Sequence, residues 1–325
     1  MDDRYFTFIK NLSSDLSNQI ARRAWVLERI GAFQPVGRRL LAQRLNIPER
    51  EIRTLATALK EDELLTLDVS GMRLTEKGME LLPMAQLFCK ELNKISELEN
   101  NLAKLFNIPK VCIVSGNSDE TEHTLVEMGK SMAVQLRSYL HNGSILAVSG
   151  GKSLLSVLQA ISTQKMNIMV VPAKGNRGYL LETQSNTIAC EMARKLGGHS
   201  RFLQLPEQIN QSTLIEMRKQ PDIEEPFSLL ERADLLLHGI GNVSGVSLAP
   251  TAVAEVCGSY FNKDGKIVHA DVVSQNVGKL KPKCQFIAIA GGEKKATAIK
   301  AVLKSRPYAL LVTDEAAAKA ILQTN

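Results

Sequence analysis

The first quarter of the chain has the hydrophobic spacing of three helices followed by a hairpin. Apolar residues recur every three or four positions, the period of an amphipathic helix, in three consecutive segments: 20–31, 37–46 and 48–62. Residues 64–69 then alternate between apolar and polar, Ser70 and Gly71 are typical of a turn, and residues 72–75 form a returning strand pattern. Three helices and a hairpin in this order predict a winged helix-turn-helix.

From residue 108 onward, short apolar runs alternate with helical patterns. The apolar runs are bounded by Gly, Pro or Ser and comprise Val111–Val114, Ile145–Val148, Ile168–Val171, Leu235–Leu237, Phe286–Ala290 and Ala309–Val312. The helical patterns cover 124–140, 152–163, 184–196, 294–304 and 314–322. This alternation predicts an α/β domain with a mostly parallel sheet covered by helices on both faces. Ligands of such sheets bind at the carboxyl ends of the strands.

Residues 76–106 join the two regions, and their pattern predicts a long helix. Because Pro83 falls early in the pattern, we expect the helix to become regular only after it. Six of seven positions at alternating spacings of four and three are apolar: Leu81, Ala85, Phe88, Leu92, Ile95, Glu99 and Leu102. This stripe fits a subunit interface and a helix packed on its own domain equally well. The predicted organisation is a winged helix-turn-helix in 1–80, a linking or oligomerisation helix in 81–107 and an α/β domain in 108–325.

Positive charge is concentrated near the amino terminus. The composition, with 44% hydrophobic and 23% charged residues, is ordinary for a globular protein. The formal net charge is +6, and residues 20–60 account for all of it, with nine Lys or Arg against three Glu. A local basic patch in a balanced chain indicates a polyanionic partner, and the alternative is a solvated helix surface with scattered arginines.

The third predicted helix suits double-stranded DNA as that partner. A helix enters the major groove while the preceding helix braces it across the backbone, and Arg and Thr can contact bases or phosphates. The expected contacts lie on the second and third helices and on the wing: Arg38, Arg39, Glu49, Arg50, Arg53, Thr54, Thr57 and Arg73. We expect a homo-oligomer, a dimer or tetramer, because symmetric operators match symmetric proteins. A three-helix protein-interaction module is the alternative.

Several other classes of protein are disfavoured. The five cysteines lack any C-x-x-C pairing, which predicts reduced thiols and no metal site. No run approaches the ~20 apolar residues that span a bilayer, and the acidic start is not a signal peptide. We therefore expect a cytoplasmic protein with no membrane partner, no metal and no cofactor.

The loop Ser149–Ser153, sequence SGGKS, follows a predicted strand and opens a predicted helix. Its glycines let the backbone approach a ligand, and the free N–H groups of a helix start attract anions. We expect one phosphate on the N–H groups of Gly151, Lys152 and Ser153. A P-loop would need glycine where Leu146 stands, so a nucleotide site is not indicated. A plain tight turn is the alternative.

Three further strand ends carry glycine or polar residues, and all should meet at the same edge of a parallel sheet. They are His238–Gly241, Ala290–Lys295 and Thr313–Glu315. Because the carboxyl ends of parallel strands converge, these loops predict a single binding site.

The carboxy-terminal two thirds resemble the sugar-binding domain of the SorC/DeoR-type transcriptional regulators. The motifs occur in the family's order: 148–151, 238–241, 255–261, 264–265, 290–292 with Lys295, Ala298 and Ile299, and 311–315. Four segments resemble in particular the regulators of glycolytic operons within it: 38–42, 71–75, 172–175 and 184–187. The resemblance covers nearly the whole chain.

This resemblance implies a repressor of a glycolytic operon whose DNA binding is modulated by a phosphorylated sugar, such as fructose 1,6-bisphosphate. It also implies an effector domain similar to ribose-5-phosphate isomerase and glucosamine-6-phosphate deaminase. The family's phosphate loop corresponds to Gly150, Gly151, Lys152 and Ser153, its polar sugar contacts to Gln184 and Glu255, and its further basic contacts to Lys174 and Lys295. We expect Lys174 or Lys295 to hold the far end of the sugar.

The chain departs from the family at two points. The phosphate loop usually reads Gly-Gly-Thr-Thr, and the segment after Gly241 lacks the arginine of the glycolytic regulators. A bisphosphate needs two cationic pockets, so Lys152 must compensate or the effector is a monophosphate. We expect weaker discrimination in favour of bisphosphates than in that family.

A sugar-phosphate isomerase or deaminase on the same fold is the alternative function. It would need a positioned acid–base pair, for which His238 and Glu255 are the best candidates. A basic amino-terminal domain has no use in such an enzyme, which favours the regulator. An adaptor protein is a third possibility, and it would require the basic helix to contact no DNA.

Overall fold

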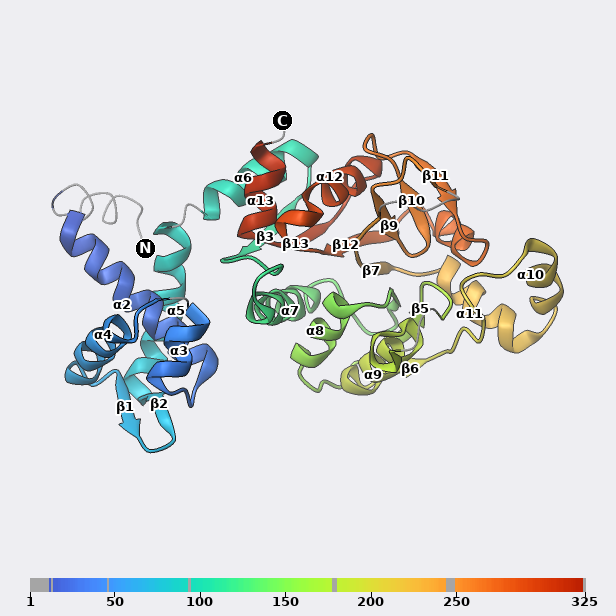
Figure 1. The fold of residues 1–325 in the computed structure, drawn as a ribbon. Coiled ribbons are helices and arrows are strands. Elements are labelled where there is room, and N and C mark those ends of the chain that lie inside the picture. The colour runs from blue at the N-terminus through green and yellow to red at the C-terminus, as the bar shows by residue number, and fades with distance from the viewer. Residues whose placement is uncertain are drawn as a thin grey trace. The chain divides into compact units, whose positions relative to one another are not determined.

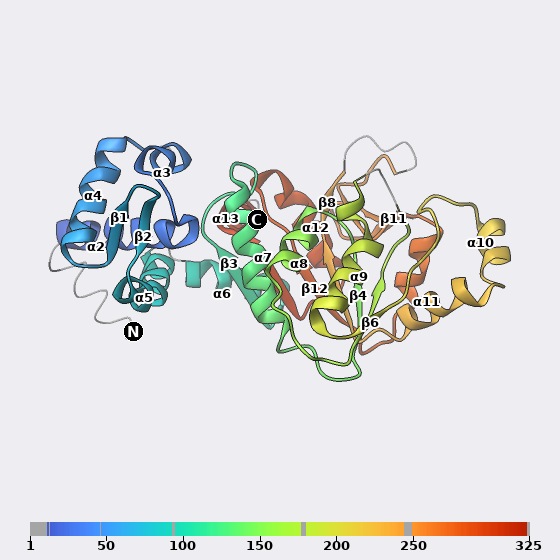
Figure 2. The same ribbon diagram turned by 90° about the horizontal axis from the view of Figure 1, so that it is seen from below.

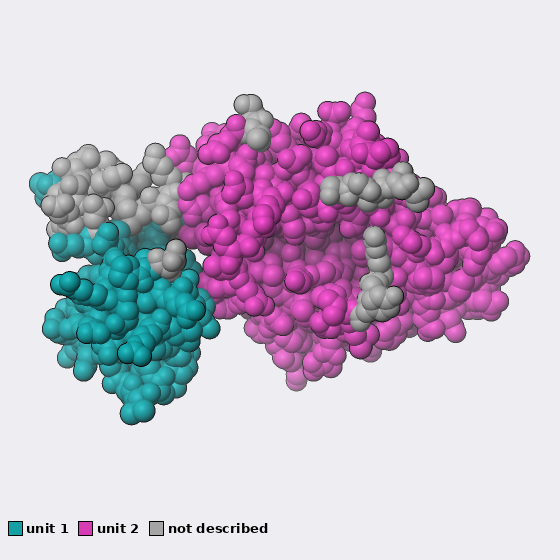
Figure 3. All heavy atoms as spheres, viewed as in Figure 1, with its two compact units in different colours: residues 1–96 teal, residues 97–325 magenta. Residues whose placement is uncertain are grey.

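The structure is a computed structural model of the 325-residue chain. It describes residues 12, 14–45, 47–92, 95–176, 180–243 and 249–323. The chain divides into two compact units, residues 1–96 and residues 97–325, coloured separately in Figure 3. The boundary falls within the segment 81–107 that the sequence predicts as a link.

The first unit is the predicted winged helix-turn-helix (Figure 1). Its elements are α2 (Ser14–Phe33), α3 (Arg38–Leu45), α4 (Glu49–Glu61), β1 (Leu65–Asp68), β2 (Gly71–Leu74) and α5 (Glu76–Leu92). Its core is formed by apolar residues from every helix and from the hairpin, including Ile30, Leu41, Ile52, Leu59 and Met72. At the tip of the wing, the Asp68 carboxylate accepts the N–H groups of Ser70 and Gly71, which closes the turn.

Within the long helix predicted over 76–106, the structure describes α5 and α6 (Ile95–Phe106), and residues 93 and 94 lie outside the described part. Pro83 lies inside α5, so the helix does not begin after it. Three residues of the predicted stripe are buried within the chain. Ala85 belongs to the core of the first unit, and Ile95 and Leu102 are fully buried. At these three positions the alternative of a helix packed on its own domain holds, whereas Leu81 of the same stripe is 42% exposed.

The second unit is built on a seven-stranded sheet in which every pairing is parallel, in the order β3-β13-β12-β7-β4-β5-β6. The strands are β3 (Lys110–Val114), β4 (Ile145–Val148), β5 (Met169–Pro172), β6 (His199–Ser200), β7 (Leu235–Gly239), β12 (Gln285–Ile289) and β13 (Leu310–Asp314). All six predicted runs are strands of this sheet, which confirms the α/β fold class. The two-residue edge strand β6 was not predicted.

Helices cover both faces of this sheet, as Figures 1 and 2 show. On one face, alternate strand residues such as Leu146, Val148, Leu235 and Leu237 pack against α7 (Glu122–Leu136), α8 (Lys152–Ala160) and α9 (Ser185–Leu196). The other face carries α11 (Pro221–Glu231), α12 (Ala296–Ser305) and α13 (Glu315–Gln323). Burial on both faces explains why the strands read as continuous apolar runs.

A second, antiparallel sheet was not predicted. Its order is β11-β10-β9-β8, with β8 (Gly241–Asn242), β9 (Ala254–Val256), β10 (Ser259–Phe261) and β11 (Ile267–Ala270). The turn between β9 and β10 has positive φ at Cys257 (49°) and Gly258 (78°), as a two-residue hairpin of the primed type requires. The register sets Glu255 opposite Gly241, just beyond the end of β7.

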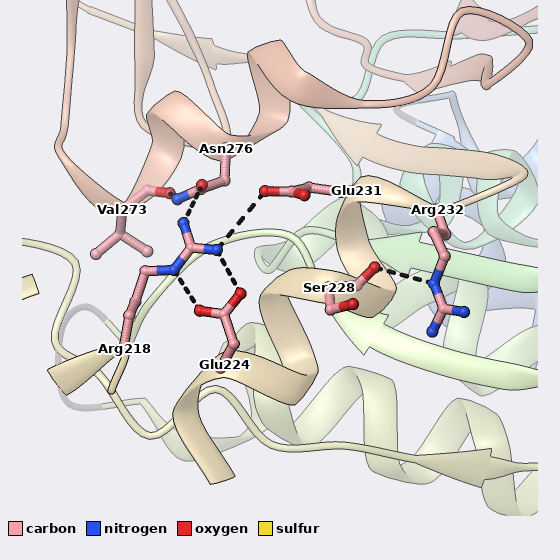
Figure 4. A network of polar contacts seen from close by, with 7 residues as sticks. All are labelled: Arg218, Glu224, Ser228, Glu231, Arg232, Val273 and Asn276. Atoms are coloured by element: carbon pink, nitrogen blue, oxygen red, sulfur yellow. Dashed lines mark hydrogen bonds and ion pairs between the residues drawn. The ribbon is translucent and has the colours of Figure 1, made fainter. Parts of the chain in front are cut away.

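A polar network fixes the segment that follows β6 (Figure 4). Arg218, at the end of α10 (Gln211–Met217), donates to both carboxylate oxygens of Glu224 at 2.6 and 2.7 Å and to the amide oxygen of Asn276 at 3.1 Å. Hydrogen bonding to this guanidinium lowers the pKa of Glu224. Because Asn276 belongs to η2 (Val273–Lys279), the network joins α11 to the chain that follows the antiparallel sheet. Among the described residues, no helix has the length and apolar character needed to cross a bilayer.

Candidate functional site

A cavity of about 350 Å³ lies where the strand ends converge at the carboxyl edge of the parallel sheet. All eight residues predicted for the effector site line it: Gly150, Gly151, Lys152, Ser153, Lys174, Gln184, Glu255 and Lys295. They come from the loops after β4, β5 and β12, from the start of α9 and from β9. The antiparallel sheet contributes because Glu255 reaches the cavity from β9.

The glycine turn after β4 is shaped by a single carbonyl. A Cβ on Gly150 would lie 2.4 Å from the carbonyl oxygen of Thr183, in η1 (Leu181–Thr183), so only glycine fits. Gly151 has φ of 106°, which also favours glycine. Its N–H donates to the same Thr183 oxygen at 2.9 Å. The prediction that Gly151 offers its N–H to a phosphate is therefore wrong, because this donor is already used.

Lys152 and Ser153 begin α8. In the described chain, no hydrogen-bond acceptor contacts their N–H groups, as is usual in the first turn of a helix. These donors point along the helix axis, where the partial positive charge of the dipole adds to the Lys152 ammonium. This end of the cavity is suited to an anion.

Lys295 lies at the same end as Lys152. Burial lowers the pKa of Lys295, Asp119 and Asp314 oppose this effect, and the positive charge of Lys152 lowers the pKa further. Of the two lysines expected to hold the far end of the ligand, Lys174 is therefore the remaining candidate. An anion between Lys152 and Lys295 would relieve their mutual repulsion.

Two aspartates, neither of them predicted as a site residue, hold the loop that carries Lys295. Asp314 is fully buried and accepts three backbone N–H groups, from Ser118, Gly292 and Ala317, at 2.7–2.8 Å. Asp119 is exposed and accepts the N–H of Lys294 at 2.9 Å. Asp314 ends a predicted strand, but nothing in the sequence pairs Asp119 with a loop 175 residues away.

The other end of the cavity is organised around Lys174. Its ammonium lies 3.5 Å from Glu207 Oε1 and 3.6 Å from Glu255 Oε1. Glu255 also accepts the N–H of Gly258 in the hairpin turn, which fixes its carboxylate. Glu207 was missed by the sequence analysis, because it lies in an irregular segment without a strand-end signal.

Ser185, the first residue of α9, was also missed. Its side chain is 1% exposed and lines the cavity, and among the described residues nothing hydrogen-bonds its hydroxyl. Buried hydroxyls are normally paired, so an unpaired one facing a cavity points to a polar ligand.

The acid–base pair considered for an enzyme is not assembled in the cavity. His238 is fully buried, does not line the cavity, and packs edge-on against Tyr308 with 5.5 Å between ring centroids. Burial lowers the pKa of His238 to about 4, so the ring is neutral. Glu255 lines the cavity, but it is paired with Lys174.

The predicted DNA-contacting residues belong to α3, α4 and the wing strand β2, and most of them are exposed. Seven of the eight are exposed, namely Arg38, Arg39, Arg50, Arg53, Thr54, Thr57 and Arg73, while Glu49 is partly buried. Ile52, Ala56 and Leu59 are buried on the opposite side of α4. Arg53 donates to both Glu49 oxygens at 3.1 and 2.9 Å, and the Thr54 hydroxyl donates to the carbonyl of Arg50. Arg53 contacts Glu49 through Nη2, so Nε and Nη1 of the same guanidinium can still donate to a base.

A basic winged helix-turn-helix joined to an α/β domain with an anion-suited cavity defines a ligand-responsive DNA-binding regulator. The model of the "CggR N-terminal DNA binding domain" matches residues 20–88, and the "Putative sugar-binding domain" model matches residues 90–323. The chain therefore belongs to the SorC-type family of sugar-binding transcriptional regulators.

Known proteins agree with this assignment. The chain is 33% identical over 330 residues to the central glycolytic genes regulator of Bacillus subtilis, covering 97% of each. A SorC-family regulator from Enterococcus faecalis is 31% identical, with a TM-score of 0.60 over 70% of this chain and 99% of that one. The full-length sorbitol operon regulator of Klebsiella pneumoniae shares the fold, with 19% identity and a TM-score of 0.65 over 89% and 94% of the two chains. These relatives are transcriptional regulators.

The turn after β4 can be tested directly. Gly150→Ala places a Cβ against the Thr183 carbonyl, so we expect a loss of about 1–3 kcal/mol in the free energy of unfolding, as for overpacked sites. Urea unfolding of the full chain measures this loss. Gly278→Ala is the matched control, because no heavy atom lies within 4 Å of its added Cβ. Equal stability of the two variants would contradict the described turn.

Proposed function

We propose that the chain is a repressor of glycolytic genes whose operator binding responds to a sugar phosphate in the cavity described above. The observation that carries this proposal is the convergence of the α8 start, Lys152 and Lys295 at one end of a cavity of sugar size, in a chain that also has a basic DNA-binding unit. The similarity to the central glycolytic genes regulator supports the choice of target genes. Binding to operator DNA places the protein in the cytoplasm.

The proposed phosphate site consists of the N–H groups of Lys152 and Ser153 and the ammonium groups of Lys152 and Lys295. Charge-assisted hydrogen bonds of this kind are roughly twice as strong as neutral ones. The Ser185 hydroxyl and Gln184 are placed to contact the sugar beside it. The effector must bind one conformation of the protein better than another, and such coupling typically amounts to about 1–3 kcal/mol.

The proposed DNA surface consists of the exposed arginines and threonines of α3, α4 and the wing. Arg38 and Arg39 open α3, where phosphate contacts are expected, whereas Arg50, Arg53 and Thr57 on α4 are placed for base contacts. The ion pair between Arg53 and Glu49 holds the guanidinium in a defined position before DNA arrives.

The DNA surface predicts two kinds of defect. Arg53→Ala should weaken binding to the specific operator by about 1–3 kcal/mol and relax the base preference, because a bidentate base contact is lost. Arg39→Ala should weaken binding to all sequences, because a phosphate contact is lost. The slope of log affinity against log salt concentration should fall in magnitude by about one, since about one fewer counterion is released. Fluorescence anisotropy at several salt concentrations measures both effects.

Arg194→Ala is the matched control for these variants, because Arg194 is an exposed helical arginine of the second unit that is paired with a glutamate of its own helix. It should bind operator as the wild type does. If Arg39→Ala and Arg53→Ala also bind as the wild type does, α4 is not the recognition helix.

The phosphate site predicts that Lys152→Ala and Lys295→Ala each weaken binding of fructose 6-phosphate by about 1.5–3 kcal/mol, the range for hydrogen bonds to charged groups. Titration calorimetry on the full chain measures the affinity. Lys130→Ala removes an exposed lysine of α7 that pairs with Glu127, and should leave the affinity unchanged. Retained affinity in both cavity variants would exclude this phosphate site, and no binding of any glycolytic phosphate to the wild type would refute the glycolytic effector.

A further inference from the structure

The two ends of the cavity differ in charge. One end holds Lys152, Lys295 and the start of α8, and the carboxylates near Lys295 are either exposed to water or bonded to backbone N–H groups. At the other end, Lys174 is paired with two carboxylates, Glu207 and Glu255. With one ammonium between two carboxylates, the side chains described at this end carry no excess positive charge.

Glu207 is held in place and cannot turn into the solvent. Its side chain is 1% exposed. Its N–H donates to the carbonyl of Asn176 at 3.0 Å, so the segment that carries it runs alongside the loop of Lys174. Gly175 permits this approach, because a Cβ there would lie 2.8 Å from the Glu207 nitrogen. A buried carboxylate stays charged where a cation or several N–H groups stabilise it. Among the described residues, the Lys174 ammonium lies 3.5 Å from Glu207 Oε1.

The same charges act on the pKa of the Cys257 thiol. Burial raises the pKa of Cys257 to about 12, with Glu255 and Glu207 contributing in the same direction and Lys174 opposing them. Both carboxylates and the Lys174 ammonium therefore lie close enough to Cys257, which lines the cavity, to act on its thiol.

We propose that Glu207, together with Glu255, is a specificity-determining residue that neutralises Lys174 and excludes a second phosphate group from the far end of the cavity. This inference rests on the proposed binding of a sugar phosphate. A phosphate monoester carries a charge of about −1.5 to −2, and close approach to two carboxylates repels it. A sugar hydroxyl fits the same place, because it donates to a carboxylate and accepts from the Lys174 ammonium. The effector is therefore a sugar with one phosphate and a hydroxyl-bearing far end.

Fructose 6-phosphate and fructose 1,6-bisphosphate differ by one phosphate and test this proposal. In calorimetry on the full chain, the wild type should bind the monophosphate at least about tenfold more tightly, which corresponds to about 1.4 kcal/mol. Glu207→Gln removes one buried negative charge and leaves Glu255 as the carboxylate beside Lys174, so it should shift the affinity ratio about tenfold toward the bisphosphate. Glu255→Gln, at a more exposed position, should shift the ratio in the same direction.

A double variant separates this charge effect from a change in structure. In Glu207→Gln combined with Lys174→Gln, the gain for the bisphosphate should disappear, because it depends on the released ammonium. Glu216→Gln removes an exposed carboxylate of α10 that is paired with Lys219. This control variant should leave the ratio unchanged. Thermal unfolding of each variant checks that the chain is folded.

The outcomes are distinguishable. If the wild type binds neither ligand nor any other sugar phosphate, the proposed function and this inference both fail. If the wild type prefers the bisphosphate and folded Glu207→Gln and Glu255→Gln keep that ratio, the proposed function stands and the role of Glu207 is refuted. A ratio that moves toward the bisphosphate in both variants, but not in the double variant, supports the inference.

Discussion

The parallel pairing of β4, β5, β7 and β12 is the constraint on which the site depends. Parallel strands send all their carboxyl ends to one edge, so loops as far apart in sequence as Ser149 and Lys295, 146 positions, open on the same cavity. No single loop makes the site. The SGGKS loop supplies a helix start, the β5 loop supplies Lys174 and the β12 loop supplies Lys295. An antiparallel arrangement would send alternate loops to opposite edges and separate the two lysines of the phosphate end.

Small backbone details turn this edge into a polarised cavity. The carbonyl of Thr183 takes the N–H of Gly151 and excludes any side chain at Gly150, which leaves Lys152 and Ser153 as the first available donors. The buried carboxylate of Asp314 ties three backbone N–H groups together and so positions the loop of Lys295. At the far end, Glu207 and Glu255 pair with Lys174. The cavity thus combines a cationic end, where a phosphate dianion is stabilised, with an end where hydroxyl groups can both donate and accept.

The sequence predicted the parallel sheet and the eight cavity residues because strand-end glycines and lysines are local signals that a parallel topology brings together. It did not predict Glu207, whose partner Lys174 is reached only through the pairing of the 174–176 loop with residues 205–207. It missed the antiparallel sheet because its hairpin turn is Cys257-Gly258 rather than a common Asn-Gly or Asp-Gly pair. The stripe over 76–106 left a subunit interface and packing within the chain open, because periodicity carries no information on which core buries each apolar residue. Ala85 and Leu102 belong to different compact units.

The central claim is that a phosphate binds at the Lys152 and Lys295 end of this cavity. A crystal structure of the full chain with fructose 6-phosphate tests it most directly. Phosphate oxygens should lie within hydrogen-bonding distance, about 2.7–3.2 Å, of the Lys152 and Ser153 backbone nitrogens, with the sugar hydroxyls directed toward Lys174 and Glu255. A phosphate beside Lys174, or a ligand bound in the hollow lined by Tyr139, His141 and Lys281, would contradict it.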